Sequence, residues 1–348
     1  MLRKWESNKK VEPKEITNTL NDGNKTKFYR LNIIFILIIG AIVSFFISNM
    51  FGTMKLSVKE ICTALINTTM DSKRIVIWNV RVPRSILAAL VGINLSISGA
   101  ILQGVMKNPL ADPGIIGISS GAGLTGIVLL IIFPEHQGLL TPVAFLGAMG
   151  AALLIYALAW KGGIQPMRVI LSGVAVSSLL GAGISALLVF YSDRVHGALM
   201  FMTGGLSARS WPQVSVILPY TIIGVIIAIL LSEKMNILIL GDDVARSLGL
   251  NVEGTRMIMT AVAAILAASA VSVVGLLGFV GLIVPHTARI IVGSNYKYLI
   301  PTSGLLGAIV LLLCDTLSRT VFSPVEIPVG VVMAVLGAPF FLYLLRKA

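Results

Sequence analysis

The chain contains a series of long runs without a charged residue, and these runs limit what it can fold into. They cover residues 85–106, 113–134, 137–160, 169–192, 210–232, 257–288, 298–314 and 327–345. A helix needs about 20 apolar residues to cross a bilayer, whereas the strands of a membrane barrel alternate in shorter segments. Only 12% of the 348 residues are charged, against about 25% in soluble domains. The sequence therefore predicts an all-α polytopic membrane protein.

The number of spans follows from the loop charges. The run from residue 257, continued to Gly293, is too long for one span, and Gly275, Gly278 and Gly281 predict a break near its middle. With two spans here, ten Lys and Arg beyond the first outer loop fall inside and three (Arg194, Arg209 and Arg319) fall outside, whereas one span divides them seven to six. Because basic residues collect in cytoplasmic loops, we expect about ten spans with both termini in the cytoplasm.

The beginning of the chain differs from the rest. Residues 1–28 are polar and mixed in charge, which predicts a disordered cytoplasmic tail before a membrane domain over 29–348. The first span is expected at Tyr29–Met50. Ser57 and Glu60 then have the spacing of a capping box, followed by apolar residues at helical spacing. This pattern predicts a short amphipathic helix at the outer surface.

Composition and motifs exclude several function classes. The net charge of +12 fits basic cytoplasmic loops near anionic lipid better than nucleic-acid binding. Cys62 and Cys314 show no pairing pattern, so we expect neither a disulfide nor a metal site, and no cofactor. The chain carries no P-loop motif and no catalytic motif. We therefore expect a pore-like protein that is not itself an enzyme.

One ionisable residue leaves an alternative open. Ion-coupled transporters carry such residues within their spans, and Asp315 is the main candidate here. Arg319 stands four residues later, which is the spacing of a helical ion pair. An ion-coupled secondary transporter is thus the competing function, although a structural Asp315–Arg319 pair is the simpler interpretation.

The polar segment Lys234–Arg256 cannot enter lipid, yet its pattern indicates order. Asp242 or Asp243 can cap a short helix over Val244–Leu248, and Gly249 can end it. The loop charges place this segment in the cytoplasm. We expect it to contact a partner in water.

Three segments together resemble the FecCD-type permeases of ABC importers for iron–siderophores, haem and cobalamin. They begin with RVPRSILAAL at Arg81, ILGDDVARSLGL at Ile239 and GFVGLIVPHTARIIVG at Gly278, and the third continues as EIPVGVVMAVLGAPFFL from Glu326. The resemblance implies a homodimer or a pair with a sister permease in a bacterial cytoplasmic membrane. It also implies two cytoplasmic ATPase subunits and an extracytoplasmic substrate-binding protein.

The resemblance also implies roles for particular residues. The ATPase-coupling contact falls on Gly241, Asp242, Ala245, Arg246, Leu248 and Gly249, and binding-protein docking falls on Arg81, Arg84 and Arg319. The cytoplasmic gate falls on Asn108 and Leu110, with a second element at Gln165 and Pro166.

The cargo is left open among related chelates. Ferric siderophore is the first choice because it is the most frequent cargo of the family, and haem and cobalamin are the alternatives. Pro285 and His286 are expected to interrupt the eighth span, with His286 bonding backbone carbonyls. Met200–Met202 are expected at the pore mouth and are not assigned as iron ligands.

Overall fold

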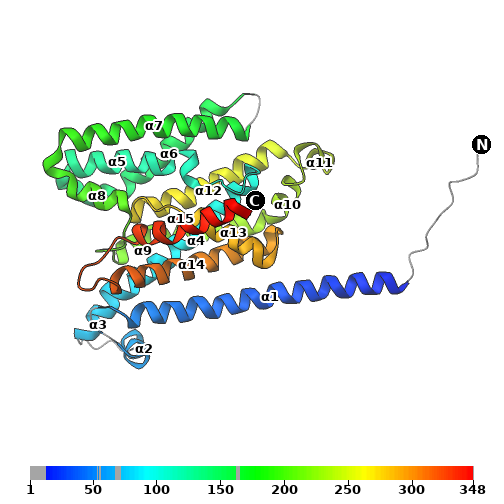
Figure 1. Ribbon diagram of the computed structural model, residues 1–348, viewed down its shortest axis with the longest axis horizontal. Coiled ribbons are helices and arrows are strands. Elements are labelled where there is room, and N and C mark those ends of the chain that lie inside the picture. The colour runs from blue at the N-terminus through cyan, green and yellow to red at the C-terminus, as the bar shows by residue number, and fades with distance from the viewer. Residues whose placement is uncertain (1–12, 53, 55, 67–71, 162–164, 348) are drawn as a thin grey trace, which may run out of the picture.

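The computed structural model describes residues 13–52, 54, 56–66, 72–161 and 165–347, and every regular element in these ranges is helical (Figure 1). This confirms the all-α fold class. The helices are, in chain order, α1 (Pro13–Met50), α2 (Val58–Ile66), α3 (Ser72–Val76), η1 (Ile77–Arg81), α4 (Val82–Val105), η2 (Pro113–Ile116), α5 (Ile118–Ile132), η3 (Pro134–Leu139), α6 (Leu140–Ala159), α7 (Pro166–Phe190), η4 (Ser192–Arg194), α8 (Val195–Thr203), α9 (Trp211–Leu230), α10 (Ser232–Leu238), α11 (Asp242–Ser247), α12 (Val252–Val274), α13 (Val280–Val292), α14 (Tyr296–Thr320) and α15 (Val329–Lys347).

Within the described ranges, seven helical segments are long and apolar enough to cross a membrane, and three further apolar helices are shorter. The seven contain α1, α4, α6, α7, α9, α12 and α14, and the shorter three are α5, α13 and α15. All apolar segments expected from the sequence are thus helices. Ten crossings with both termini in the cytoplasm stay a prediction.

Helix α4 lies at the centre of the bundle and contacts α9, α12, α13 and α14. Two glycine contacts bring its backbone very close to its neighbours. A Cβ added to Gly92 would lie 2.1 Å from the carbonyl oxygen of Gly307, and one added to Gly99 would lie 1.9 Å from that of Gly281. In lipid, small residues allow such close approach and the dispersion contacts that come with it. The core of the protein is therefore a tight group of α4, α12, α13 and α14.

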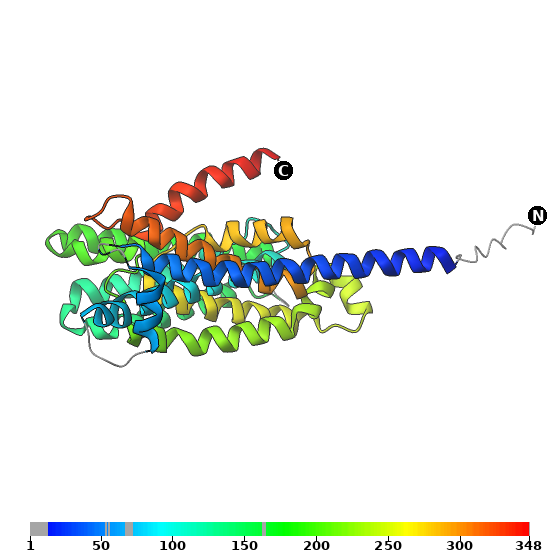
Figure 2. The same ribbon diagram turned by 90° about the horizontal axis from the view of Figure 1, so that it is seen from below.

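The remaining helices surround this core. α5, α6, α7 and α8 lie together on one side, and α1 runs along α14 on the opposite side (Figure 1). α15 diverges from the bundle toward the C-terminus, and the N-terminal part of α1 extends well beyond it (Figure 2).

The expected tail is not separate from the first span. α1 begins at Pro13 and continues without a break through Met50, so residues 13–28 are described as helix. Proline fits the start of a helix because its missing N–H has no partner there in any case, and no second proline follows before Pro83. Residues 1–12 of the expected tail lie outside the described residues.

The break between α12 and α13 falls where the glycines predict it. Gly275 (φ +82°) and Phe279 (φ +68°) turn the chain in the left-handed region. Pro285, however, lies inside α13, so the expected interruption at this proline is wrong. A proline lacks the N–H that would bond the carbonyl four residues earlier, and the side chain of Gln103 donates to that carbonyl of Gly281 at 3.3 Å instead.

Candidate functional site

The loop Lys234–Arg256 is built on the two short helices α10 and α11, at the opposite end of the bundle from α2 and α3 (Figure 1). Gly241 (φ +115°) joins the two helices, and Gly249 (φ +79°) ends α11 as expected. The N–H of Leu250 then bonds the carbonyl of Ala245 at 3.0 Å. Ala245 itself is fully buried. The loop therefore has a defined shape.

The expected cap of this helix is wrong. α11 begins at Asp242 rather than at Val244, and Gly241 is its N-cap residue, without a side-chain cap. The carboxylate of Asp242 is used elsewhere. Its Oδ1 lies 2.8 Å from Nζ of Lys107, which follows α4, and 3.0 Å from Nη2 of Arg256 in α12.

These contacts also decide the charge of Asp242. Partial burial acts to raise its pKa, but the hydrogen bonds and charges of Lys107 and Arg256 outweigh burial and lower the pKa below the ordinary value. Asp242 is thus ionised at neutral pH. Its contacts join the loop to the end of α4 and to the start of α12.

Apolar side chains of the loop are exposed. The side chains of Leu240, Val244 and Leu248 are 59%, 46% and 60% exposed. Arg246 beside them is exposed too and lies 3.9 Å from Glu253. Adjacent exposed apolar side chains on a water-facing loop indicate a surface that a partner covers.

The turn after α4 holds the first predicted gate element. Asn108 Oδ1 accepts a hydrogen bond from the N–H of Leu110 at 2.9 Å, and Asp112 Oδ1 accepts one from Gly114 at 2.8 Å. These are the local bonds that asparagine and aspartate commonly make in turns. Leu110 is 41% exposed at the tip. The turn is rigid and presents one apolar side chain.

The second predicted gate element lies just before α7. Gln165 is exposed and is the N-cap residue of α7, although its side chain makes no capping bond. Pro166 is the first residue of the helix, and its side chain lies outside the described residues. η2, which follows the Asn108 turn, contacts α7. The two gate segments therefore belong to neighbouring elements.

The predicted docking arginines take part in a buried ion-pair network. Asp315 is fully buried between two guanidinium groups, with Oδ1 3.0 Å from Nη2 of Arg84 and Oδ2 3.1 Å from Nε of Arg319. The Asp315–Arg319 pair expected from the sequence is confirmed. Arg84 also contacts Glu326 at 2.9 Å.

The donors of these arginines are satisfied within the chain. Arg81 donates to the carbonyls of Asn49 and Met54, and Arg319 donates to the carbonyl of Ser48. Arg81, Arg84 and Arg319 are only 5%, 8% and 8% exposed. The sequence predicted guanidinium groups that face a partner. The structure instead places them below the surface.

Sequence reasoning missed several members of this network. Ser48 and Asn49 close an otherwise apolar span, and polar residues at such positions commonly have a specific partner. Glu326 is a lone acid at the start of the last apolar run. The polar pair Ser48 and Asn49 and the lone acid Glu326 could therefore have indicated this network in the sequence. The π-helical turn Ile77–Arg81 has no sequence signal that we can name.

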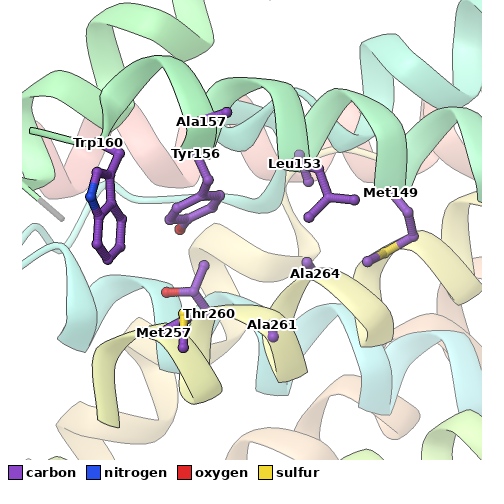
Figure 3. A pocket seen from close by; sticks show the side chains of 10 residues that line it. Met149, Leu153, Tyr156, Ala157, Trp160, Met257, Thr260, Ala261 and Ala264 are labelled. Carbon is purple, nitrogen blue, oxygen red and sulfur yellow. The ribbon is translucent and has the colours of Figure 1, made fainter. Parts of the chain in front are cut away.

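An apolar pocket of about 300 Å³ lies between α6 and α12. Figure 3 shows Tyr156 of α6 directed toward Thr260 of α12, with Trp160 and Met257 at one end and Met149 at the other. Its lining is almost wholly apolar, which suits a lipid chain better than a metal chelate.

The other residues singled out in the sequence are not brought together. His286 is half-buried on α13, whereas Met200–Met202 lie on α8. Met200 lines a separate pocket at the other end of the bundle from α11.

Comparisons with known proteins agree with this arrangement. The model of the FecCD transport family matches residues 37–347. The chain is 43% identical over 314 residues to the Fe(3+)-citrate import system permease protein YfmE of Bacillus subtilis, covering 90% of this chain and 94% of that protein. It is 42% identical over 278 residues to the cobalamin import system permease protein BtuC of Halobacterium salinarum, covering 79% and 74%.

A solved structure supports the same assignment. It is described as an inward-facing metal-chelate type ABC transporter, and it matches with a TM-score of 0.82 at 30% identity, covering 91% of this chain and 99% of that one. The family match, the two permeases and the shared fold agree over nearly the whole chain. The protein belongs to the FecCD transport family, as a multi-pass permease of an ABC importer for metal chelates in the cytoplasmic membrane.

Proposed function

We propose that the chain forms the pore of an importer that carries a ferric chelate, first of all a ferric siderophore, into the cell. Two copies, or one copy and a sister permease, enclose the pore. Two separate ATPase subunits bind on the cytoplasmic side, and an extracytoplasmic binding protein delivers the cargo. The cargo names of the two relatives, Fe(3+)-citrate and cobalamin, support a metal chelate, and haem and cobalamin are the alternative cargoes.

The observation that carries this proposal is the water-facing loop Lys234–Arg256. It is rigid, and it presents Leu240, Val244 and Leu248 to solvent. A groove on an ATPase subunit would cover these side chains and so remove apolar surface from water. Gly241, Asp242, Ala245, Arg246, Leu248 and Gly249, the coupling residues named above, all lie in α11 or at its ends.

The loop is also linked to the proposed gate. Asp242 contacts Lys107, and the next residue, Asn108, begins the turn that presents Leu110. A displacement of α11 by the ATPase would therefore act directly on this turn. Gln165 and Pro166, at the start of α7, form the second part of the proposed gate.

The outer ion-pair network supports a modified form of the docking proposal. Arg81, Arg84 and Arg319 carry three positive charges, and Asp315 and Glu326 carry two negative charges. The network is therefore net positive, and this charge can orient an acidic binding protein. The three arginines would act mainly through this field and by shaping the docking face, since their guanidinium groups lie below the surface.

The ion-coupled alternative finds no support in the contacts of its candidate residue. A proton relay needs a carboxylate that can exchange protons along a path. Asp315 is fully buried, and both of its oxygens are held by Arg84 and Arg319. These contacts fit a structural role.

Reconstitution tests the proposal. The permease, its ATPase subunits and its binding protein are placed in proteoliposomes, and uptake of radiolabelled chelates is measured. We expect uptake that needs ATP and persists with a protonophore. Uptake that collapses with the protonophore and survives without ATP would establish the ion-coupled alternative instead.

A further inference from the structure

A second pocket lies at the end of the bundle that the proposed topology places outside the cell. Its volume is about 390 Å³, and it is formed by the ends of α5, α8 and α12, the start of α6 and the loops before α9 and α15. Much of its wall is apolar and includes Leu130, Leu140 and Phe201. Its polar and charged side chains are Gln137, Ser207, Arg209 and Glu326.

Arg209 is the unusual member of this set. No hydrogen bond or ion pair joins its guanidinium group to any residue that the structure describes, and its Nε is fully buried without a partner. Burial lowers the pKa of Arg209, yet arginine remains protonated in proteins. Arg209 as a whole is partly exposed, but a charged donor atom that is shut off from water without an acceptor destabilises the chain that carries it. Such a group is expected where a ligand supplies the acceptor.

The other outer arginines are different. Arg319 is paired with Asp315 at 3.1 Å, and Arg194 lies 3.4 Å from Asp193. Arg209 therefore stands apart from the two other arginines that the charge pattern places outside beyond the first outer loop.

The backbone holds Arg209 in a fixed position. Ala208 before it has a left-handed conformation with φ +58°. Ser210 after it begins α9 with a complete capping box, in which its N–H donates to Gln213 Oε1 at 3.0 Å. The N-terminus of α9, a helix of 20 residues, adds partial positive charge beside the arginine.

Glu326 lines the same pocket but does not neutralise Arg209. Its carboxylate contacts Arg84 at 2.9 Å and accepts a hydrogen bond from Ser207 at 2.9 Å. Partial burial acts to raise the pKa of Glu326, but Arg84 and Ser207 outweigh burial and lower it. Glu326 is thus ionised and paired, and the positive charge of Arg209 stays available.

We propose that this pocket is an outer binding subsite for the negatively charged oxygen groups of the cargo. Arg209 pairs with an ionised carboxylate or catecholate of the chelate, and the apolar wall contacts its organic part. The inference rests on the proposed function and narrows it, because it assigns the cargo to anionic chelates and excludes neutral ones.

Uptake into proteoliposomes by the whole importer tests this inference. The probes are ferric citrate, ferric enterobactin and haem as anionic cargoes, and ferrichrome and cyanocobalamin as neutral ones. We expect the wild-type protein to transport an anionic probe. Arg209→Gln should reduce uptake of that probe by about tenfold or more, since a hydrogen bond to a charged group of this kind changes binding by about 10- to 100-fold. Arg209→Lys should retain part of the uptake because lysine keeps the positive charge. It should not restore full uptake, because an ammonium group lacks the paired N–H donors of a planar guanidinium group.

Two controls separate this role from others. Arg194→Gln removes an outer arginine that lies outside the pocket and should leave uptake unchanged. Arg209→Gln should not lower the melting temperature of the permease, because no partner in the chain is lost. It should also leave the affinity for the binding protein unchanged. Weaker docking of that protein would make Arg209 a docking residue and would overturn the subsite.

The remaining outcomes are distinct. If the wild-type protein transports only ferrichrome or cyanocobalamin, the importer function holds and the anion subsite is wrong. Full uptake of an anionic probe by Arg209→Gln also overturns the subsite. If no probe is taken up with ATP present, the proposed function fails and the subsite fails with it.

Discussion

The carboxylate of Asp242 lies 2.8 Å from the ammonium group of Lys107, although the two residues are 135 positions apart in the chain. Arg256 holds the same carboxylate from α12 at 3.0 Å. One acidic side chain of the loop Lys234–Arg256 thus joins the end of α4 to the start of α12. This contact connects the proposed ATPase surface to the proposed gate.

Breaking the contact should uncouple transport from ATP hydrolysis. Both Lys107 and Asp242 are partly exposed, so the pair itself contributes only about 0–1 kcal/mol to stability. We expect Lys107→Met and Asp242→Asn to lower the amount of chelate moved per ATP hydrolysed. Lys107→Met should change the melting temperature little, whereas Asp242→Asn also removes an ion-pair partner of the buried Arg256 and should lower it. Lys297→Met, which removes another cytoplasmic lysine from an exposed pair with Glu233, is the control. If both test variants move as much chelate per ATP hydrolysed as the wild-type protein, the contact does not couple ATP hydrolysis to transport.

The same contact should not depend on pH in the neutral range. The folded-state pKa of Asp242 is lowered, so its ionised form stabilises the loop above the ordinary pKa and loses this effect only as pH falls through the lower folded value. We therefore expect the ratio of wild-type to Asp242→Asn coupling to stay constant between about pH 5.5 and about pH 8.5. A ratio that approaches one near pH 6 would contradict this assignment.

The apolar face of the loop should be required for ATPase binding. Leu248→Glu places a charge among side chains that the partner is proposed to cover, and burying an unpaired charge is costly. We expect the ATPase to dissociate from the permease in a pull-down from detergent. Phe28→Glu, at a residue that is 68% exposed in α1, should retain the ATPase. If both variants retain the ATPase equally, the loop is not part of the ATPase interface.

The shape of the loop should matter as much as its surface. Gly249 has φ +79°, which proline cannot adopt and which costs other residues about 1–2 kcal/mol. We expect Gly249→Pro to abolish coupled uptake and Gly249→Ala to reduce it, while the permease remains in the membrane. Ala245→Arg should act like the proline variant because Ala245 is fully buried. Gly150→Ala in α6, where an added Cβ meets no atom within 4 Å, is the control for the alanine variant.

The outer arginine network should first of all stabilise the fold. Asp315→Ala would leave Arg319 without its ion-pair partner and Arg84 with only the partly exposed Glu326, and breaking a buried pair costs about 3–5 kcal/mol. We expect a clear fall in the melting temperature of the purified permease. Glu326→Gln, which removes the more exposed partner of Arg84, should have a smaller effect. If Asp315→Ala instead weakens only docking of the binding protein and leaves the melting temperature unchanged, the network forms a docking interface and does not stabilise the fold.

Features set by neighbouring residues could be predicted from the sequence. The glycines at 275–281 mark the break between α12 and α13, and Ser57 and Glu60 form the expected capping box, with the Ser57 N–H donating to Glu60 at 2.9 Å. The Asp315–Arg319 pair follows from helical spacing alone. In each case the partners are at most a few residues apart, so the backbone geometry decides the contact.

Features set by distant partners could not be predicted. Aspartate is a common helix-cap residue, but the carboxylate of Asp242 is bound by Lys107 and Arg256 instead. Arg84 looks like an exposed outer charge until the fold brings Asp315 and Glu326 beside it. Pro285 looks like a helix break until Gln103 supplies the missing donor. The alternative partner in all three cases comes from another segment of the chain.

The glycine contacts of α4 determine which parts of the protein can move. Gly92 and Gly99 seat this helix so closely on Gly307 and Gly281 that a single methyl group would collide with backbone. Helices in such contact have no clearance to slide past one another, and thus α4, α13 and α14 behave as one rigid body. In the proposed importer, alternating access is then expected to come from rotation of that body against the second permease subunit, or from displacement of α7, which neither of these glycine contacts joins to it.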